Sequence, residues 1–430
     1  MFSEFDWYKN GAGDLIIGII FMIISILLFV GRTNLYKDVI NIVVLILLLL
    51  SVFQLIRFFY KKQSVKESSK TFLSCVFNLI VSLIFFMLPD LPLGLLPVLF
   101  SIYLFLLGTA QFVMYYVFFK NRASGKMRNL LWGLIYYSIS LPILFAPLNR
   151  ISNFLLCLSL YTFLLSLNFI YDFVNSCISK RTKDNLKRKI RITLPVLIEA
   201  IIPYSVMVKI NKSLEPSLYK KHQRRRSDDT NMSILIHTSN RGVNKFGHID
   251  IIFDGKVISY GNYDEGSRNY LEFCGDGVMF TTESKSEYIN FCIDNSKKTL
   301  FEFKIYLNNK QYKKVKEKIE SIMKDTIEWD CRMDKRYDGG SSYAAKLYKK
   351  TKATFYKFKS GKYKTYFVLG TNCCYLADDI IAKSGTDILS LNGIITPGTY
   401  YDYLEKELYR KGGIVVSKSI YNEYARAIDE

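Results

Sequence analysis

The hydrophobic pattern divides the 430-residue chain into two unlike parts. Up to about residue 177 the chain consists of long apolar runs with short polar gaps, and the remainder mixes apolar and polar residues as soluble proteins do. The six apolar runs lie at about 14–30, 38–59, 71–89, 92–119, 127–147 and 150–177. Most are close to the ~20 residues that a membrane-spanning helix requires. We therefore expect an all-α domain of six transmembrane helices over residues 1–180, and the short gaps predict three helical hairpins.

Small residues recur within the first, third and fifth runs at a spacing of seven. The pairs are Gly18 and Ser25, Cys75 and Ser82, and Gly133 and Ser140. Small residues two helical turns apart let helix backbones approach closely in lipid. We interpret the recurrence as a threefold repeat of a hairpin, and chance among many apolar residues is the alternative.

Basic residues concentrate after the second, fourth and sixth runs, and the alternate gaps hold few of them. The positive-inside rule then predicts a protein of the cell (plasma) membrane with both termini cytoplasmic. The N-terminus carries Glu4 and Asp6 and lacks a small-residue cleavage site, so we expect no cleaved signal peptide. No run has a central charged residue, which leaves a channel or transporter without an obvious ion carrier.

The arrangement of six short helices in three hairpins, with small residues at repeated positions, resembles the HdeD-like membrane family (DUF308). The resemblance covers residues up to about 180 and rests on pattern. That family is associated with acid-stress resistance in bacteria, so the resemblance implies a role in stress response. It implies no chemistry that could be carried over to particular residues.

Residues 181–230 form a strongly basic linker. Within it, the apolar stretch 193–210 is interrupted by Pro195, Glu199 and Pro203. We interpret this stretch as an interfacial amphipathic helix on the inner leaflet. A seventh span is the alternative, and it would place everything after it outside the cell.

From residue 231 to 430 the pattern predicts an α+β domain. Strands are expected at about 233–238, 248–253, 256–260, 277–281, 300–306, 352–358 and 363–369, and helices at about 308–325, after Gly370, and at 399–410. Asn308 can cap the first of these helices. The strand before Gly370 breaks there, and Cys373, Leu376 and Ala377 then follow at helical spacing.

This helix start carries the candidate chemistry. Cys373 falls on its first turn, where free backbone N–H groups and the helix dipole stabilise a thiolate. His248 begins a strand–turn–strand segment that runs from Gly247 to Tyr260. A Cys and a His on separate elements are what thiol nucleophilic catalysis requires. The alternative for Cys373 is an ordinary buried helix residue; Cys374 lies on the other side of the helix.

The segment Gly247-His248-Ile249-Asp250-Ile251-Ile252-Phe253-Asp254-Gly255-Lys256-Val257-Ile258 resembles the strand pair of the NlpC/P60 superfamily that holds the catalytic His. Here the Cys helix follows this pair, an order similar to the circularly permuted papain-like branch with the lecithin:retinol acyltransferase-like and YiiX-like proteins. The resemblance implies Cys373 as nucleophile and His248 as base. The residue that orients His248 would be Ser259, with Asn262 or Asp264 as alternatives; His237 is interpreted as structural.

The distribution of charge and the spacing of the cysteines limit the kinds of partner and ligand that the sequence predicts. The net charge is +20, but it gathers beside the apolar runs and in the linker, which favours anionic lipid headgroups over nucleic acid. The eight cysteines show no CxxC spacing. We therefore expect neither a zinc site nor another metal or cofactor.

These observations predict a membrane-anchored cytosolic cysteine hydrolase or acyltransferase. Its substrate would be an unknown acyl or peptide compound with an amide, peptide or thioester bond. The alternative is a non-enzymatic, stress-related membrane protein whose soluble domain binds or senses a ligand. The sequence leaves a homo-oligomer open.

Overall fold

The structure is a computed structural model. It describes residues 12–60, 65–177, 202–208, 230–239, 247–270, 272–332, 342–384, 396–409 and 414–426. The chain divides into two compact units. One contains the described parts of Met1–Ile16, Ala110–Leu130 and Asn168–Glu430, and the other contains Ile17–Thr109 and Leu131–Leu167.

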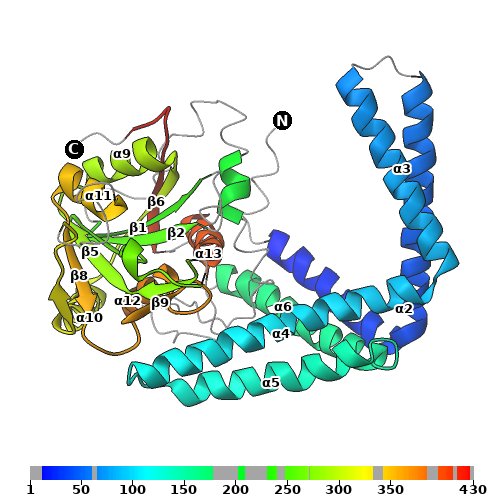
Figure 1. Ribbon diagram of the computed structural model, residues 1–430, viewed down its shortest axis with the longest axis horizontal. Helices are drawn as coiled ribbons and strands as arrows, with labels where there is room; N and C mark the ends of the chain where they lie inside the picture. Colours follow the sequence, from blue (N-terminus) through cyan, green and yellow to red (C-terminus); the bar gives the residue numbers. More distant parts are fainter. Residues whose placement is uncertain are drawn as a thin grey trace. The chain divides into compact units, whose positions relative to one another are not determined.

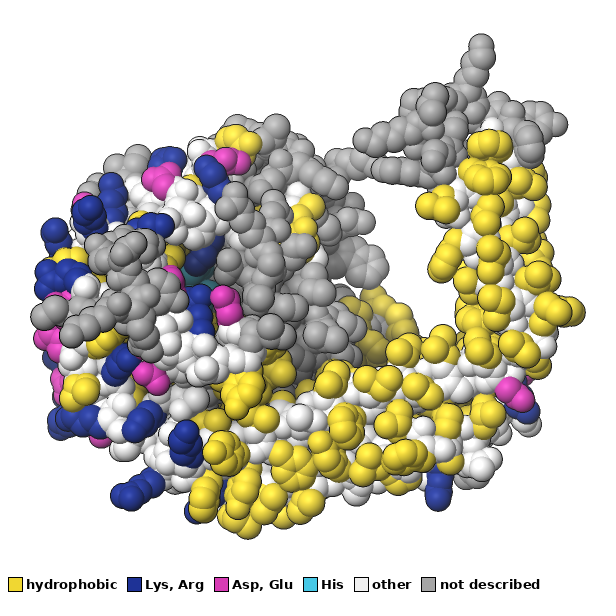
Figure 2. Space-filling model, viewed as in Figure 1, with side chains coloured by type: hydrophobic (Ala, Val, Ile, Leu, Met, Phe, Trp, Pro, Cys, Tyr) yellow, Lys and Arg dark blue, Asp and Glu magenta, His cyan; other side chains and the backbone are white. Residues whose placement is uncertain are grey.

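Long helices make up the chain up to Cys177. They are α2 (Ala12–Tyr60), α3 (Val65–Met87), α4 (Asp90–Lys120), α5 (Lys126–Phe145) and α6 (Ile151–Cys177). Within the described residues, four segments are long and apolar enough to cross a membrane: Gly13–Gly31, Thr33–Ile56, Asp90–Lys120 and Ile151–Val174. Their apolar side chains form a nearly uncharged surface in Figure 2. The helices are therefore compatible with integration in a lipid bilayer.

The first two apolar runs lie in one helix, α2, in which the candidate spans Gly13–Gly31 and Thr33–Ile56 follow each other without an interruption of the helix. The described residues 12–177 thus contain five helices where six were expected. The gap around residues 31–37 holds no proline that would break a helix. Tyr36, inside the gap, is buried, and its hydroxyl donates to the carbonyl of Leu93 at 3.0 Å.

The six recurring small residues are all buried. Several of them lie where helices touch. The hydroxyls of Ser25 and Ser159 each donate to the other's carbonyl at 3.0 Å. The thiol of Cys75 donates to the carbonyl of Ser51 at 3.2 Å. These positions therefore bring helix backbones together, as the spacing predicts for small residues in lipid.

An antiparallel sheet organises the α+β part (Figure 1). Its order is β10-β6-β1-β2-β3-β5-β8-β7. The strands are β1 (Met232–Thr238), β2 (His248–Phe253), β3 (Lys256–Gly261), β5 (Val278–Thr282), β6 (Thr299–Ile305), β7 (Thr326–Glu328), β8 (Thr354–Phe358) and β10 (Val415–Tyr421). A separate pair joins β4 (Cys274–Asp276) to β9 (Thr365–Phe367).

Helices cover both faces of this sheet because its strands are apolar on both sides. One core contains side chains of α10 (Asn309–Lys324), α12 (Cys373–Ile381) and α13 (Pro397–Tyr409). The other contains side chains of α9 (Lys285–Ser296) and α11 (Tyr343–Thr351). Successive strand residues point to opposite faces, so Ile251 enters the first core and Ile252 the second. The α+β class is confirmed.

Only a short piece of the basic linker belongs to the described residues. Residues 202–208 are helical, and Met207 is 1% exposed within the core that also contains α12. This piece of the predicted interfacial helix therefore packs on protein. The other residues of 181–230 up to Asp229 lie outside the described part.

Candidate functional site

The site lies where β2 and β3 separate. The two strands pair over Ile251–Phe253 and Lys256–Ile258, and the first residues of β2 extend beyond this ladder. Gly247, just before β2, has φ +83, a conformation that favours glycine. A Cβ there would stand 3.1 Å from Pro397 and 3.3 Å from the carbonyl oxygen of His237. Glycine therefore lets the chain enter β2 at His248 while passing close to two neighbours.

The nucleophile candidate occupies the first residue of α12. Asn372 is the N-cap: its side-chain oxygen accepts from the backbone N–H of Tyr375 at 3.1 Å. Its amide nitrogen donates to the carbonyl of Val368 at 2.9 Å. The cap leaves the N-terminal end of the helix dipole directed at Cys373, which favours a thiolate.

The sulfur of Cys373 lies where α12 packs against β2, and the residue is only 4% exposed. The thiol of Cys374, the ring of His248 and the backbone N–H of Ile249 act on its ionisation there. The hydrogen bond from Cys374 and, after it, the positive charge on His248 hold the pKa of Cys373 well below its usual range, against the effect of burial. Burial and the bond to Cys373 raise the pKa of Cys374 well above its usual range. The two adjacent thiols therefore differ sharply in acidity.

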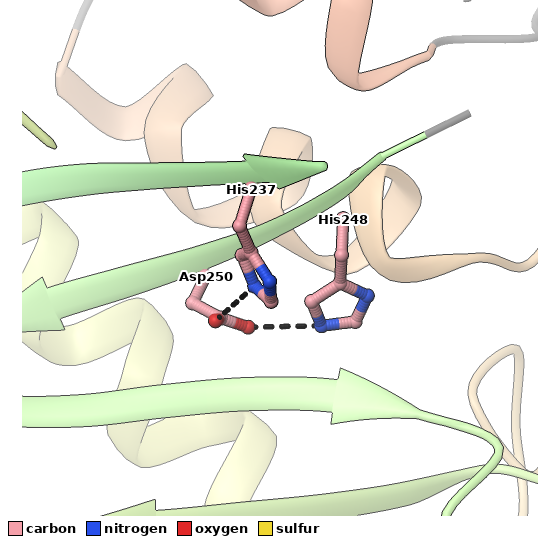
Figure 3. Close-up of side chains that lie close together, drawn as sticks. All are labelled: His237, His248 and Asp250. Carbon is pink, nitrogen blue, oxygen red and sulfur yellow. Dashed lines mark hydrogen bonds and ion pairs between the residues drawn. The ribbon is translucent and has the colours of Figure 1, made fainter. Parts of the chain in front are cut away.

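The ring of His248 faces a buried carboxylate, Asp250 (Figure 3), and the charge of Cys373 also acts on it. Its Nε2 lies 3.0 Å from Oδ1 of Asp250 and 3.1 Å from the hydroxyl oxygen of Ser259. The hydroxyl of Tyr263 lies 3.2 Å from the same nitrogen. Burial acts to lower the pKa of His248, but the charges on Cys373 and Asp250 raise it to about 10. The geometry thus favours a thiolate–imidazolium pair.

Hydrogen bonds hold one oxygen of Asp250, and the ring of His248 faces the other. Its Oδ2 accepts from Nε2 of His237 at 2.8 Å and from the hydroxyl of Tyr288 at 2.7 Å, which leaves Oδ1 facing His248. Burial acts to raise the pKa of Asp250, but His248 and His237 hold it well below its usual range. Burial and the charge of Lys298 lower the pKa of His237 to about 3, so this ring donates as a neutral group.

The structure brings together three of the residues singled out from the sequence: Cys373, His248 and Ser259. Asn262 lies elsewhere: its amide nitrogen is 3.5 Å from the carbonyl oxygen of Glu272. Asp264 pairs with Lys357 at 2.6 Å.

Sequence analysis missed Asp250 as a partner of His248. Residues two apart on a strand share a face, so the signal was present in His248-Ile249-Asp250. The same geometry gives His237 a second role beside the structural one expected for it. His237 pairs with His248 in the β1–β2 register, which places its ring beside Asp250.

A tyrosine occupies the position next to the backbone of the nucleophile. The hydroxyl of Tyr366 lies near the backbone N–H of Cys373, and burial and the nearby Cys373 thiolate raise the pKa of Tyr366 well above its usual range. A neutral phenol and a backbone N–H are both donors that can stabilise a developing oxyanion. The helix start thus offers two such groups beside the sulfur.

The same cluster offers donors for a metal ion. One atom each of His237, His248 and Asp250 lies within 4.8 Å of the others. The Nε2 atoms of both histidines, however, already face Asp250 at 2.8 and 3.0 Å, and these are hydrogen-bond distances. A metal ion would have to replace both contacts, so the geometry fits a hydrogen-bonded acid–base chain better.

Comparisons with protein-family models, with curated proteins and with solved structures found no match to this chain.

Proposed function

We propose that the protein is a membrane-anchored cysteine hydrolase or acyltransferase. The observation that carries this proposal is the chain of contacts from Cys373 through His248 to Asp250. A buried thiolate, an imidazolium and an orienting carboxylate are the parts of a thiol nucleophile and its general acid–base partner. The permuted papain-like resemblance in the same residues supports the same chemistry.

The proposed reaction has two acyl-transfer steps. The thiolate of Cys373 adds to an acyl carbon, and the bond to the leaving group breaks while His248 gives that group its proton. This step leaves a thioester on Cys373 and a neutral imidazole. Water or another acceptor then attacks the thioester, and His248 takes the acceptor's proton as the thiolate leaves. Asp250 keeps the ring oriented, and the Cys373 N–H and Tyr366 hydroxyl stabilise the oxyanion in both steps.

The acyl bond is proposed as an amide, peptide or thioester, as the resemblance implies. The basic gaps that follow the second, fourth and sixth apolar runs favour a cytoplasmic site. In this arrangement the membrane helices anchor the enzyme at the inner leaflet of the cell membrane.

The first test is the pH dependence of Cys373 alkylation in the full chain, reconstituted in nanodiscs and followed by mass spectrometry. An ordinary thiol with a pKa of ~8.5 loses about tenfold in rate for each pH unit below that value. Because the pKa of Cys373 is held low and that of His248 is raised to about 10, we expect a nearly constant rate from about pH 6 to 9. His248→Ala should restore the steep dependence. An ordinary profile that the substitution leaves unchanged would overturn the proposal.

A binding or sensing module is the second candidate, because Cys373 is only 4% exposed and His248 18% in its side chain. Acyl thioesters and acyl-amide probes separate the two functions. An enzyme should show an acyl mass increment on Cys373 that decays with turnover, with none on a Cys373→Ser variant. A reactive thiol that no acyl probe modifies would favour the binding module.

A further inference from the structure

Three large apolar side chains are exposed on two neighbouring segments, one of which leads to the nucleophile. Tyr270 is 82% exposed, Phe273 42% and Leu369 38%. Backbone bonds hold their segments together: Phe273 N–H donates to Tyr270 O at 3.2 Å, and Val368 N–H to Phe273 O at 3.0 Å. Leu369 stands four residues before Cys373. We call Tyr270, Phe273 and Leu369 the apolar patch.

The segments that carry the apolar patch also pack against the end of α4, within the same compact unit. Phe367 of β9 is buried in a cluster with Met114 and Phe118 of α4, and Cys274 of β4 packs against this cluster. A Cβ at Gly370 would collide with the sulfur of Met114.

Polar contacts fix the same junction. The side-chain nitrogen of Asn121 donates to the hydroxyl of Thr365 at 2.9 Å, and Asn121 O accepts from Gly361 N–H at 3.0 Å. Asn121 immediately follows α4, and Thr365 begins β9. The segments that carry the apolar patch are therefore packed on the end of α4, a helix that is long and apolar enough to cross a membrane.

The length of α4 places this junction close to the membrane surface. Its 31 residues span about 46 Å at 1.5 Å per residue, whereas the hydrocarbon core of a bilayer is about 30 Å thick. The excess lets the residues from Ala110 onward leave the hydrocarbon and pack on protein. Lys120, Arg122, Lys126 and Arg128 follow at this end. On the soluble side, Lys364 is exposed five residues before Leu369, and Arg268 precedes Tyr270 by two residues and pairs with Glu272 at 3.5 Å. A basic rim of this kind complements anionic headgroups.

We propose that the apolar patch inserts into the membrane leaflet at which α4 ends, with the basic residues beside it on lipid phosphates. Exposed apolar clusters on a soluble domain mark interaction surfaces, and here the adjoining surface is the bilayer. Insertion holds the Cys373 site against that leaflet, independently of the reaction performed there.

Tryptophan fluorescence in lipid tests this proposal directly. Trp7, Trp132 and Trp329 are first replaced by Phe, and single tryptophans are introduced as Phe273→Trp or Tyr270→Trp in the full chain. Tyr424→Trp is the matched control, because Tyr424 is 63% exposed and follows β10, an edge strand of the large sheet to which β4 and β9 do not belong. In nanodiscs whose lipids carry bromine on the acyl chains, we expect several-fold stronger quenching at the patch than at position 424. Equal quenching at all three positions would overturn the proposal.

A second pair of variants tests the lipid charge. Arg268→Glu with Lys364→Glu should reduce the quenching of the Phe273→Trp probe about twofold or more in phosphatidylglycerol nanodiscs. In phosphatidylcholine the same change should have little effect. Cys373 alkylation serves as the folding control. Unchanged quenching in both lipids, with alkylation intact, would exclude the basic rim from the contact.

Discussion

At the scale of single residues, Asp250 connects the two histidines of the site. Its Oδ1 faces His248, while His237 and Tyr288 donate to its Oδ2. The pKa of this carboxylate stays well below its usual range although it is buried, because the charge on His248 and, after it, the hydrogen bonds favour the charged form. The carboxylate can therefore stabilise a positive charge on His248 throughout the neutral pH range.

Asp250→Asn should remove the negative charge beside His248 and leave the shape of the side chain nearly unchanged. The amide is nearly isosteric but neutral, so the pKa of His248 should fall and that of Cys373 should rise. We expect the alkylation rate of Cys373 at pH 6 to drop about tenfold or more, with a smaller loss at pH 9. The pH profile measures this outcome, and Asp276→Asn, at an exposed carboxylate, is the control. Equal losses at both pH values would instead indicate a general structural defect.

His237 should act on the thiol through Asp250 and through its ring contact with His248. Loss of a hydrogen bond to a charged group costs about 1.5–3 kcal/mol, so His237→Ala should lower the unfolding temperature and raise the pKa of Cys373. His237→Gln keeps an N–H donor and should recover part of both losses. Thermal unfolding and the alkylation profile are the two readouts. If the two variants behave identically, His237 is a packing residue and no more.

At the scale of secondary structure, the sequence predicts best where one local signal dominates. The β2–β3 hairpin is evident from its apolar strands and from Asp254-Gly255 at the turn, and the observed strands agree closely. Asn308 forms the expected cap, completed by Gln311 as a capping box. Helices α9 and α11 were missed, as was β10, because packing on the sheet determines these short elements more than local pattern does.

In the candidate site too, the sequence predicts local features better than long-range contacts. Helical spacing and the break at Gly370 predicted the position of Cys373 on α12. The contact between His237 and Asp250 depends on the register of β1 against β2, which pairs His237 with His248. Register is a long-range property, and the sequence alone did not supply it.

The N-cap of α12 offers a prediction at this scale. Asn372→Ala removes a cap worth ~1 kcal/mol and the bond to Val368. The first turn of α12 should loosen, so the unfolding temperature should fall and the alkylation of Cys373 at pH 6 should slow. Asn308→Ala removes the cap of α10 and is the matched control, with a similar loss of stability and an unchanged thiol. A thiol equally affected by both variants would contradict this role of Asn372.

At the scale of the whole molecule, the α+β domain begins before residue 231, the start that composition suggests, because residues 202–208 already belong to its core. Met207, in the segment expected at the membrane surface, is buried in the core that contains α12. Loss of a fully buried apolar side chain of this size costs about 2–5 kcal/mol. A fragment of residues 231–430 should therefore unfold at a lower temperature than one of residues 202–430. Met207→Ala in the longer fragment should reproduce most of the difference, and coincident melting of the two fragments would refute it.

The contact between Asn121 and Thr365 joins residues that are 244 positions apart in the sequence. Residues from the end of α4 leave the ribosome long before β9 and α12 are made, since chains grow by about 5–20 residues per second. The apolar end of α4 therefore exists for ten seconds or more without the surface that later covers it. Cys373 likewise acquires its neighbours only near the end of synthesis. Synthesis thus completes the apolar helices first and the surroundings of the Cys373 thiol among the last parts of the protein.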